Sequence, residues 1–173
     1  MRETKYLEIA PGSLVFATER MSKHIVTIRW KNNAGADFLK LKYSREHSWE
    51  FDGGARVAAS SSPSIVPVPF SNPANVDPEE AFIAAVSSCH MLWFLSLAAE
   101  KGFVVESYLD AAEGAMEKNE KGALWISEIT LKPRIVYEGR RPTADEEDRL
   151  HHESHERCFI ANSIRTNVIV AKG

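Results

Sequence analysis

The longest uncharged stretch of the chain runs from Ala81 to Ala99, and it limits the possible folds more than any other feature. These 19 residues include no Asp, Glu, Lys or Arg, and 15 of them are apolar. A membrane-spanning helix needs about 20 such residues. However, three serines and a histidine interrupt the stretch, and the residues just before it are acidic rather than basic. We therefore expect a helix buried on all sides in a protein core, and no membrane partner.

Capping signals predict the ends of this helix and the start of a second one. The sequence DPEE at 77–80 combines an N-cap residue, a proline suited to the first helical position and a glutamate that can complete a capping box. Gly102 predicts the end of the helix after about Lys101. The sequence TADE at 143–146 repeats the capping pattern and predicts a polar helix that reaches about Cys158.

Alternating apolar and polar residues predict the strands. We expect a β-hairpin of strands 24–30 and 37–43, followed by a third strand at 47–51. A long antiparallel hairpin of strands 104–117 and 124–137 and a final strand at 164–170 complete the prediction. Residues 58–75 contain four prolines and five serines and predict an extended loop. This order of elements, without an internal repeat, predicts an α+β fold with a mostly antiparallel sheet.

Composition and charge exclude several classes of protein. The 173 residues carry 21 Lys plus Arg against 24 Asp plus Glu, and no basic cluster, so the electrostatic footprint of a nucleic-acid-binding protein is missing. A chain of this length can bury its own core without a disulfide scaffold. The first 20 residues hold acidic side chains and no secretory-type apolar run, so we expect a cytoplasmic protein.

Cys89 lies about eleven residues into the predicted apolar helix, in the sequence SSCH. It is too far from the N-terminal turn for the helix dipole to favour its thiolate, and apolar surroundings favour the neutral thiol. From the residues alone, Cys89 is either a small core residue or a nucleophile that needs a cation to activate it.

Cys158 ends the second predicted helix, and it shares one helix face with His151 and His155 at i, i+4 and i+7 spacing. Three interpretations are open: a solvated polar face, a zinc site built from these three residues, and a redox partner for Cys89. The spacing matches no strong zinc pattern. A disulfide with Cys89 would need the two Cα atoms within about 7 Å.

A longer motif surrounds Cys89. It consists of Asn72-Pro73, DPEEAF at 77–82, Ala84-Ala85 and Ser87-Ser88-Cys89. This string is similar to the N-P-E-E-L-x-A-A-x-x-A-C helix of the OsmC/Ohr family of organic hydroperoxide reductases, and the second cysteine about 70 residues later also matches. The likeness covers roughly His24 to Ala171. We therefore expect residues 1–20 to be an N-terminal extension and residues 21–173 to be a single OsmC-like domain.

The resemblance implies a fold, an activity and partners. Members of the family fold with mostly antiparallel sheets wrapped around a central buried helix, and they form intertwined homodimers. They use no cofactor and reduce organic hydroperoxides to alcohols. By this likeness Cys89 would attack the peroxide as the peroxidatic thiol, Cys158 would resolve the product as a disulfide, and a dithiol reductant of the lipoyl type would reset the pair.

The resemblance also implies further site residues. The family activates its thiolate with an arginine held by a glutamate, and Glu79 matches that glutamate. Arg45 is our first candidate for the arginine, and Arg56 is the alternative. The candidates for an apolar substrate pocket are Phe70, Phe82, His90 and Trp93.

Two residues depart from the family pattern. His90 follows the first cysteine where an aromatic residue is usual, and Phe159 follows the second where proline is usual. Both changes lie next to the expected site, so it is an open question whether this chain keeps the fast peroxidase cycle of the family. The alternative function is a non-catalytic protein on the same fold, either a redox sensor or a binder of a small molecule or metal.

Helix geometry sets a condition on Glu79. Ten residues at about 1.5 Å each place it roughly 15 Å along the axis from Cys89, too far for one guanidinium to touch both across a straight helix. Three explanations are open. The helix bends or begins later, or the arginine and glutamate reach the thiol from a partner chain, or Glu79 only stabilises the helix N-terminus.

Overall fold

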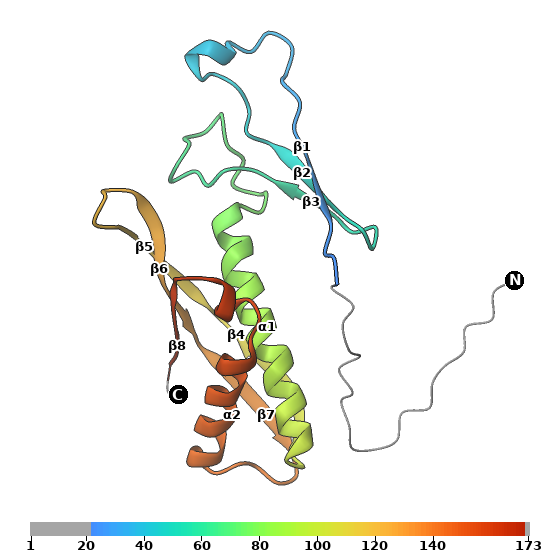
Figure 1. Cartoon of the computed structure of the whole chain (residues 1–173). Coiled ribbons are helices and arrows are strands. Elements are labelled where there is room, and N and C mark those ends of the chain that lie inside the picture. Colours follow the sequence, from blue (N-terminus) through green and yellow to red (C-terminus); the bar gives the residue numbers. More distant parts are fainter. Residues whose placement is uncertain (1–21, 172–173) are drawn as a thin grey trace, which may run out of the picture.

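The computed structural model describes residues 22–171, and the first part of them is a small sheet set beyond the N-terminal end of a long helix (Figure 1). In this sheet β1 (Val26–Arg29), β2 (His47–Phe51) and β3 (Arg56–Ala59) pair antiparallel in the order β1-β2-β3. β2 has its predicted bounds, and the expected extended loop follows β3. The predicted extension 1–20 lies outside the described residues.

The predicted strand at 37–43 is wrong. β1 pairs with β2 instead, and the residues between them include a 3-10 turn, η1 (Phe38–Lys40), closed by Leu41 with a φ of 61°. Phe38 stacks on Tyr43 with ring centroids 4.5 Å apart, and Trp30 meets the edge of Tyr43 at 5.6 Å. The apolar residues whose alternation suggested a strand therefore gather three aromatic rings around a turn.

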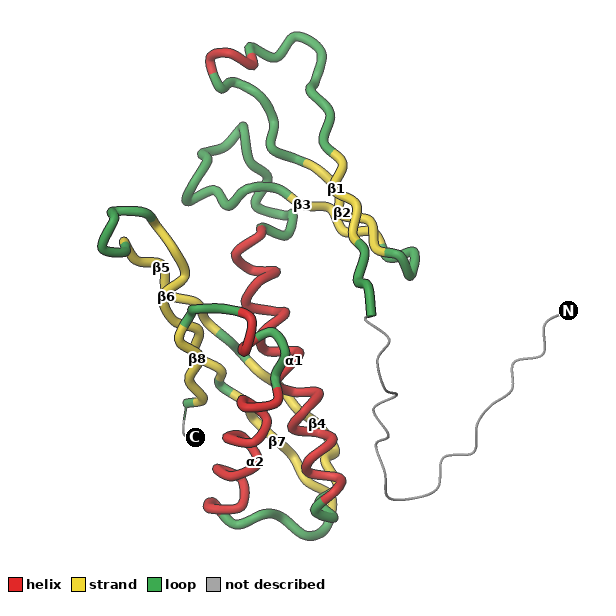
Figure 2. Tube along the Cα trace, in the orientation of Figure 1, coloured by secondary structure: helices red, strands yellow, loops and turns green. Residues whose placement is uncertain are grey.

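Two helices form where their capping signals predict. α1 (Pro78–Glu100) follows the N-cap Asp77, and α2 (Ala144–Arg157) follows the N-cap Thr143; both capping boxes are complete. Gly102, with a φ of 77°, ends α1 as expected. The helices lie side by side and run in opposite directions (Figure 2).

The predicted long hairpin forms with the expected antiparallel pairing, but a break at residues 111–112 divides it between two sheets. β4 (Val104–Asp110) pairs antiparallel with β7 (Pro133–Glu138), while β5 (Glu113–Lys118) pairs antiparallel with β6 (Leu124–Leu131). The break follows from Asp110, whose carboxylate accepts hydrogen bonds from the backbone N–H of Lys132 at 2.6 Å and from the hydroxyl of Ser87. The final strand, β8 (Asn167–Val170), pairs with β6 in parallel after a short turn, η2 (Ala161–Ser163).

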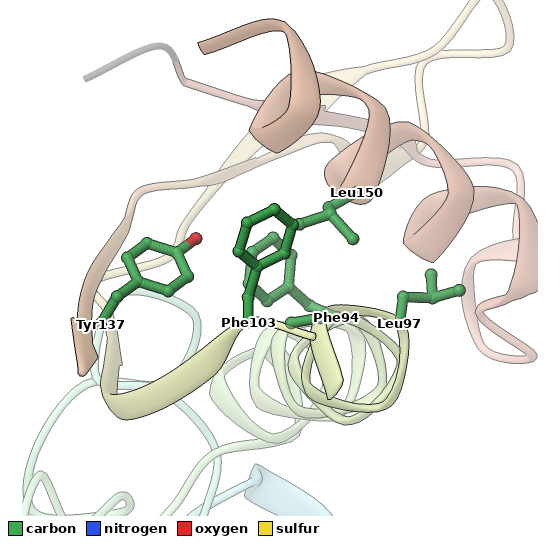
Figure 3. Close-up of a cluster of buried hydrophobic side chains, with 6 residues drawn as sticks. Phe94, Leu97, Phe103, Tyr137 and Leu150 are labelled. Carbon is green, nitrogen blue, oxygen red and sulfur yellow. The ribbon is translucent and has the colours of Figure 1, made fainter. Parts of the chain in front are cut away.

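The buried core consists of two apolar clusters along α1. One lies between α1, α2 and the β4–β7 sheet, and its members include Phe94, Leu97, Phe103, Tyr137 and Leu150 (Figure 3). The other joins Val86 of α1 to Ile129 and Leu131 of β6. Together the two clusters hold α1 against α2, against the β4–β7 sheet and against the β5–β6–β8 sheet.

The observed burial of α1 differs from the expected burial on all sides. Within one chain, five of its residues are buried: Val86, His90, Phe94, Leu97 and Ala98. Leu92 is 57% exposed, and Ala84, Ala85, Ser88 and Ser96 are also exposed. In residues 22–171, α1 is the one helix whose length and hydropathy would suit a membrane span, a test that a core helix also passes.

Candidate active site

The two cysteines, 69 residues apart in sequence, lie together where α2 ends against the middle of α1. Both are free thiols, Cys89 partly exposed and Cys158 fully buried, and the Cys89 thiol is close enough to raise the pKa of Cys158. Cys158 is the C-cap residue of α2, and its Sγ accepts a hydrogen bond from the backbone N–H of Ala161 at 3.3 Å. The α1–α2 packing therefore brings the two cysteines close together.

The two thiols differ in their surroundings. Burial, followed by the neighbouring Cys89 thiol, raises the pKa of Cys158 to about 11, against the opposing effect of the Ala161 and Ile160 backbone N–H groups. Cys158 therefore stays a neutral thiol near pH 7. Cys89 is the more accessible of the two to a reagent from solvent.

An aromatic wall flanks the thiol pair. Trp93 lies one helical turn after Cys89, and Phe159 meets its ring edge-on with centroids 5.7 Å apart. The guanidinium of Arg157 lies 5.7 Å from the Trp93 ring centroid. Phe159 is 65% exposed, so this wall offers apolar surface beside the sulfur atoms.

His90 is directed toward α2. Its Nε2 lies 3.1 Å from Nδ1 of His151, and the two rings are nearly parallel. Burial, followed by the neighbouring His151 and His155, lowers the pKa of His90 to about 4. His90 is therefore neutral near pH 7 and adds no positive charge beside Cys89; its place in a substrate pocket stays a prediction.

Arg45 belongs to the N-terminal part of the chain. Its guanidinium lies 3.8 Å from the centroid of the Tyr43 ring and 5.9 Å from that of Phe70, and it donates hydrogen bonds to the carbonyls of Leu41 and Tyr43. It lines a cavity of about 440 Å³ together with Ile28, Trp30, Phe38, Tyr43, His47, Ser61 and Pro78. None of these contacts is with either cysteine.

The alternative arginine, Arg56, lies on the exposed surface of β3. Its guanidinium is 3.6 Å from the carboxylate of Glu50 and 3.4 Å from the hydroxyl of Ser48. Arg56 also lines a cavity, of about 760 Å³, whose wall includes Trp30 and His47, so both arginines stay candidates for meeting a bound molecule.

Glu79 lies in the first turn of α1, with Phe82 one turn further on. Both line a second cavity of about 520 Å³, to which Arg165 of the segment before β8 also contributes. The Oε2 atom of Glu79 is buried and has no hydrogen-bond partner within residues 22–171. Because a buried carboxylate oxygen without a hydrogen-bond partner is unfavourable, this oxygen is available to bind a cation that another molecule supplies.

The candidate residues thus form separate groups within one chain. Cys89, Cys158 and Trp93 lie together, Arg45 and Phe70 lie together, and Glu79 and Phe82 lie between them at the start of α1. Within the described residues, no group of three or more His, Cys, Asp or Glu side chains could hold a metal ion, which leaves the zinc interpretation of His151, His155 and Cys158 without support.

Two contacts at the site were missed from the sequence. The sequence marks Phe159 as a departure from the family pattern, and its position after Cys158 places it near Cys89 if the two thiols pair. The His90–His151 contact joins residues 61 positions apart. Its only sequence signal was that His151 shares a helix face with Cys158.

Comparisons with known proteins agree on the fold. The family model described as OsmC-like protein matches residues 71–171. An OsmC-like protein of unknown function from Vibrio cholerae is 50% identical, with a TM-score of 0.85 over 87% of this chain and 99% of that chain. No curated protein matches the chain.

Two more distant structures share the fold. An organic hydroperoxide resistance protein from Legionella pneumophila is 16% identical, with a TM-score of 0.62 over 89% of this chain and 100% of that chain. One from Bacillus subtilis is 18% identical, with a TM-score of 0.61 over 87% of this chain and 96% of that chain.

Proposed function

The chain belongs to the OsmC-like protein family, and we propose that within it this protein is a cysteine-based peroxidase that reduces organic hydroperoxides to alcohols. The observation that carries the proposal is that the α1–α2 packing sets Cys89 beside Cys158, with Trp93 against Phe159 and His90 against His151 next to them. A core cysteine needs no second thiol beside it, whereas a peroxidase that resolves its product needs a thiol within reach of the first. Some proteins of this fold are described as organic hydroperoxide resistance proteins, which agrees with the proposal.

The proposed reaction has three steps: oxidation of Cys89, formation of a disulfide, and reduction of that disulfide. The Cys89 thiolate attacks the terminal oxygen of ROOH; the O–O bond breaks, Cys89 becomes a sulfenic acid, and the alkoxide takes a proton to leave as ROH. The sulfur of Cys158 then attacks the sulfenic sulfur, and water leaves as the disulfide forms. A dithiol reductant returns both cysteines to thiols and is itself oxidised to a disulfide.

The difference in burial suits this division of roles. The more exposed Cys89 meets the peroxide, while the raised pKa of Cys158 keeps it a neutral thiol that does not compete for the substrate. The wall formed by Trp93 and Phe159 supplies apolar surface for the organic tail of the peroxide at roughly 25 cal/mol per Å² buried. Such a wall favours organic hydroperoxides over hydrogen peroxide.

The cation that activates Cys89 comes, in this proposal, from a second copy of the chain. Arg45 makes all its contacts at the N-terminal side, and the helix that carries Cys89 leaves a row of small and apolar residues exposed. The N-terminal part exposes further large apolar side chains: Ile25, Val26, Ile28, Leu39 and Leu41. A homodimer in which each N-terminal part covers the partner's α1 would bury both surfaces and bring Arg45 of the partner subunit to Cys89.

The test measures the turnover of cumene hydroperoxide by the purified protein, with dihydrolipoamide as the reductant. We expect the wild type to cycle many times, Cys89→Ser to be inactive, and Cys158→Ser to stop after one turnover with a sulfenic acid that dimedone traps. Lys121→Ala, a change in the exposed turn between β5 and β6, is the control and keeps full activity. A wild type that forms the disulfide once but does not cycle would instead be a redox sensor, and two unreacted thiols would overturn both functions.

A further inference from the structure

The interface between α1 and α2 has three successive layers. Cys89 and Cys158 form the first, His90 and His151 the second, and the apolar cluster around Phe94 and Leu150 the third. The middle layer is a buried polar contact between the thiol pair and the apolar cluster, and the proposed peroxidase steps do not use it. His90 is 1% exposed, which makes it one of the largest fully buried side chains of the described residues.

The hydrogen bonding of the pair defines a tautomer. The Nδ1 atom of His90 is buried without a partner in residues 22–171, while Nε2 faces His151. If Nδ1 carried the proton, a buried N–H donor would be left unsatisfied; we therefore assign the proton to Nε2, which donates to Nδ1 of His151. The second proton of the pair is then on Nε2 of His151, which lines an open cavity of about 800 Å³.

A directional bond at this place controls the position of the thiols. Apolar packing tolerates small sliding of one helix past another, whereas an N–H···N bond weakens steeply when its angle or length changes. His90 is the residue after Cys89, and His151 lies two turns before Cys158 on the same face of α2. A disulfide in turn requires its Cβ atoms to lie about 3.5 to 4.5 Å apart.

We propose that the His90–His151 hydrogen bond is a positioning device that sets the register of α2 on α1 and so holds the Cys158 thiol where it can form a disulfide with Cys89. His90 and His151 act on the reaction only through the two cysteines. The inference concerns the thiol pair of the proposed function, but it can be measured without any peroxide.

The experiment is a thiol–disulfide equilibrium in glutathione buffers, read by alkylation and intact mass. Two thiols of the protein give two electrons and two protons to oxidised glutathione, which becomes two molecules of reduced glutathione; the equilibrium constant is the effective concentration of the Cys89–Cys158 pair. We expect His90→Leu to lower it at least tenfold. His90→Gln keeps an N–H donor near the position of Nε2, so we expect it to stay within threefold of the wild type.

A double variant separates positioning from stability. In His90→Leu/His151→Leu both polar partners are removed, so the melting temperature recovers relative to His90→Leu, because no imidazole is left unsatisfied. The effective concentration stays at least tenfold low, because the directional bond is still missing. Leu150→Val is the matched control: it lowers the melting temperature at the same interface and leaves the effective concentration within twofold.

The outcomes distinguish this inference from the proposed function. If His90→Leu or the double variant keeps the wild-type effective concentration, the pair is only core packing and the inference is overturned, while the peroxidase proposal stands. If the wild type itself forms no Cys89–Cys158 disulfide in any glutathione buffer, the resolving step of the proposed function fails as well.

Discussion

Glu79 and Cys89 lie on one unbroken helix, ten residues apart, so their positions along its axis differ by about 15 Å. Because α1 begins at Pro78 and continues to Glu100 without a sharp bend (Figure 1), neither a later start nor a bend of the helix brings them together. Arg45 of the same chain contacts neither residue. The two remaining explanations are a partner chain that supplies the cation, and a Glu79 that only stabilises the start of the helix.

A complementation experiment decides whether Arg45 acts across a dimer. We expect Arg45→Gln and Cys89→Ser to be inactive as homodimers, since each lacks one essential group at both sites. A mixed dimer of the two variants has one site with an intact Cys89 and, from the other chain, an intact Arg45. It should therefore recover up to half of the wild-type peroxidase activity, measured after mixed refolding and separation by two affinity tags.

Arg56→Gln provides the control for this experiment, since its ion pair with Glu50 lies on the exposed surface of β3. We expect its homodimer to retain nearly full activity. An inactive mixed dimer of Arg45→Gln with Cys89→Ser would show that Arg45 serves its own chain, and an active Arg45→Gln homodimer would show that Arg45 is not required.

Much of the fold could be predicted because local chemistry determines it. Both helices begin at their capping boxes, and their starts were predicted from four-residue patterns. Residues 37–43 show where local prediction fails. They alternate between apolar and polar residues as a strand does, but Phe38 stacks on Tyr43 and the segment forms a turn. The split of the long hairpin depends on a hydrogen bond from Lys132 to Asp110, across 22 residues, which no local pattern reveals.

The site was predictable to a different degree. The thiol pair was expected from a family resemblance, and the structure places Cys89 near Cys158, but the roles of both cysteines, like those of Arg45 and Glu79, stay predictions. Within one chain the Arg45 guanidinium contacts neither thiol. In the proposed function the two meet only across a dimer, and no local sequence pattern predicts how two chains assemble. The His90–His151 contact could not be predicted, because it depends on the register of α2 on α1.

Gly114 marks a close approach of β5 to α1. A Cβ added at this position would lie 2.6 Å from Cδ1 and 3.0 Å from Cγ1 of Ile83. We expect Gly114→Ala to lower the free energy of unfolding by about 1 to 3 kcal/mol, because Ile83 has to leave its position in the core. Urea denaturation at pH 7 measures the change.

A second substitution tests the cause of this effect. Ile83→Val removes the Cδ1 atom, so the double variant with Gly114→Ala should be less destabilised than the sum of the two single variants. Gly53→Ala is the matched control, since nothing lies within 4 Å of its added Cβ. Additive effects of the two substitutions would refute the proposed clash.

The buried imidazole of His90 gives the stability of the protein a defined dependence on pH. Its pKa is about 4 in the folded chain, lowered by burial and by His151 and His155, against about 6.5 when unfolded. Between these values the unfolded chain binds a proton that the folded chain does not, so the stabilising contribution is complete above about pH 6.5 and is lost as pH falls toward 4. The loss amounts to about 3 kcal/mol.

Urea denaturation between pH 7 and pH 4.5 measures this loss, with His90→Leu as the comparison. The groups that face the pair from α2 and β4 are present in both proteins, so their contribution largely cancels in the difference; they include His155, Glu147, Asp148 and Asp110. We expect the free energy of unfolding to fall less steeply with pH in His90→Leu than in the wild type. Parallel curves would mean that His90 titrates in the folded chain as it does in water, which its burial beside His151 opposes.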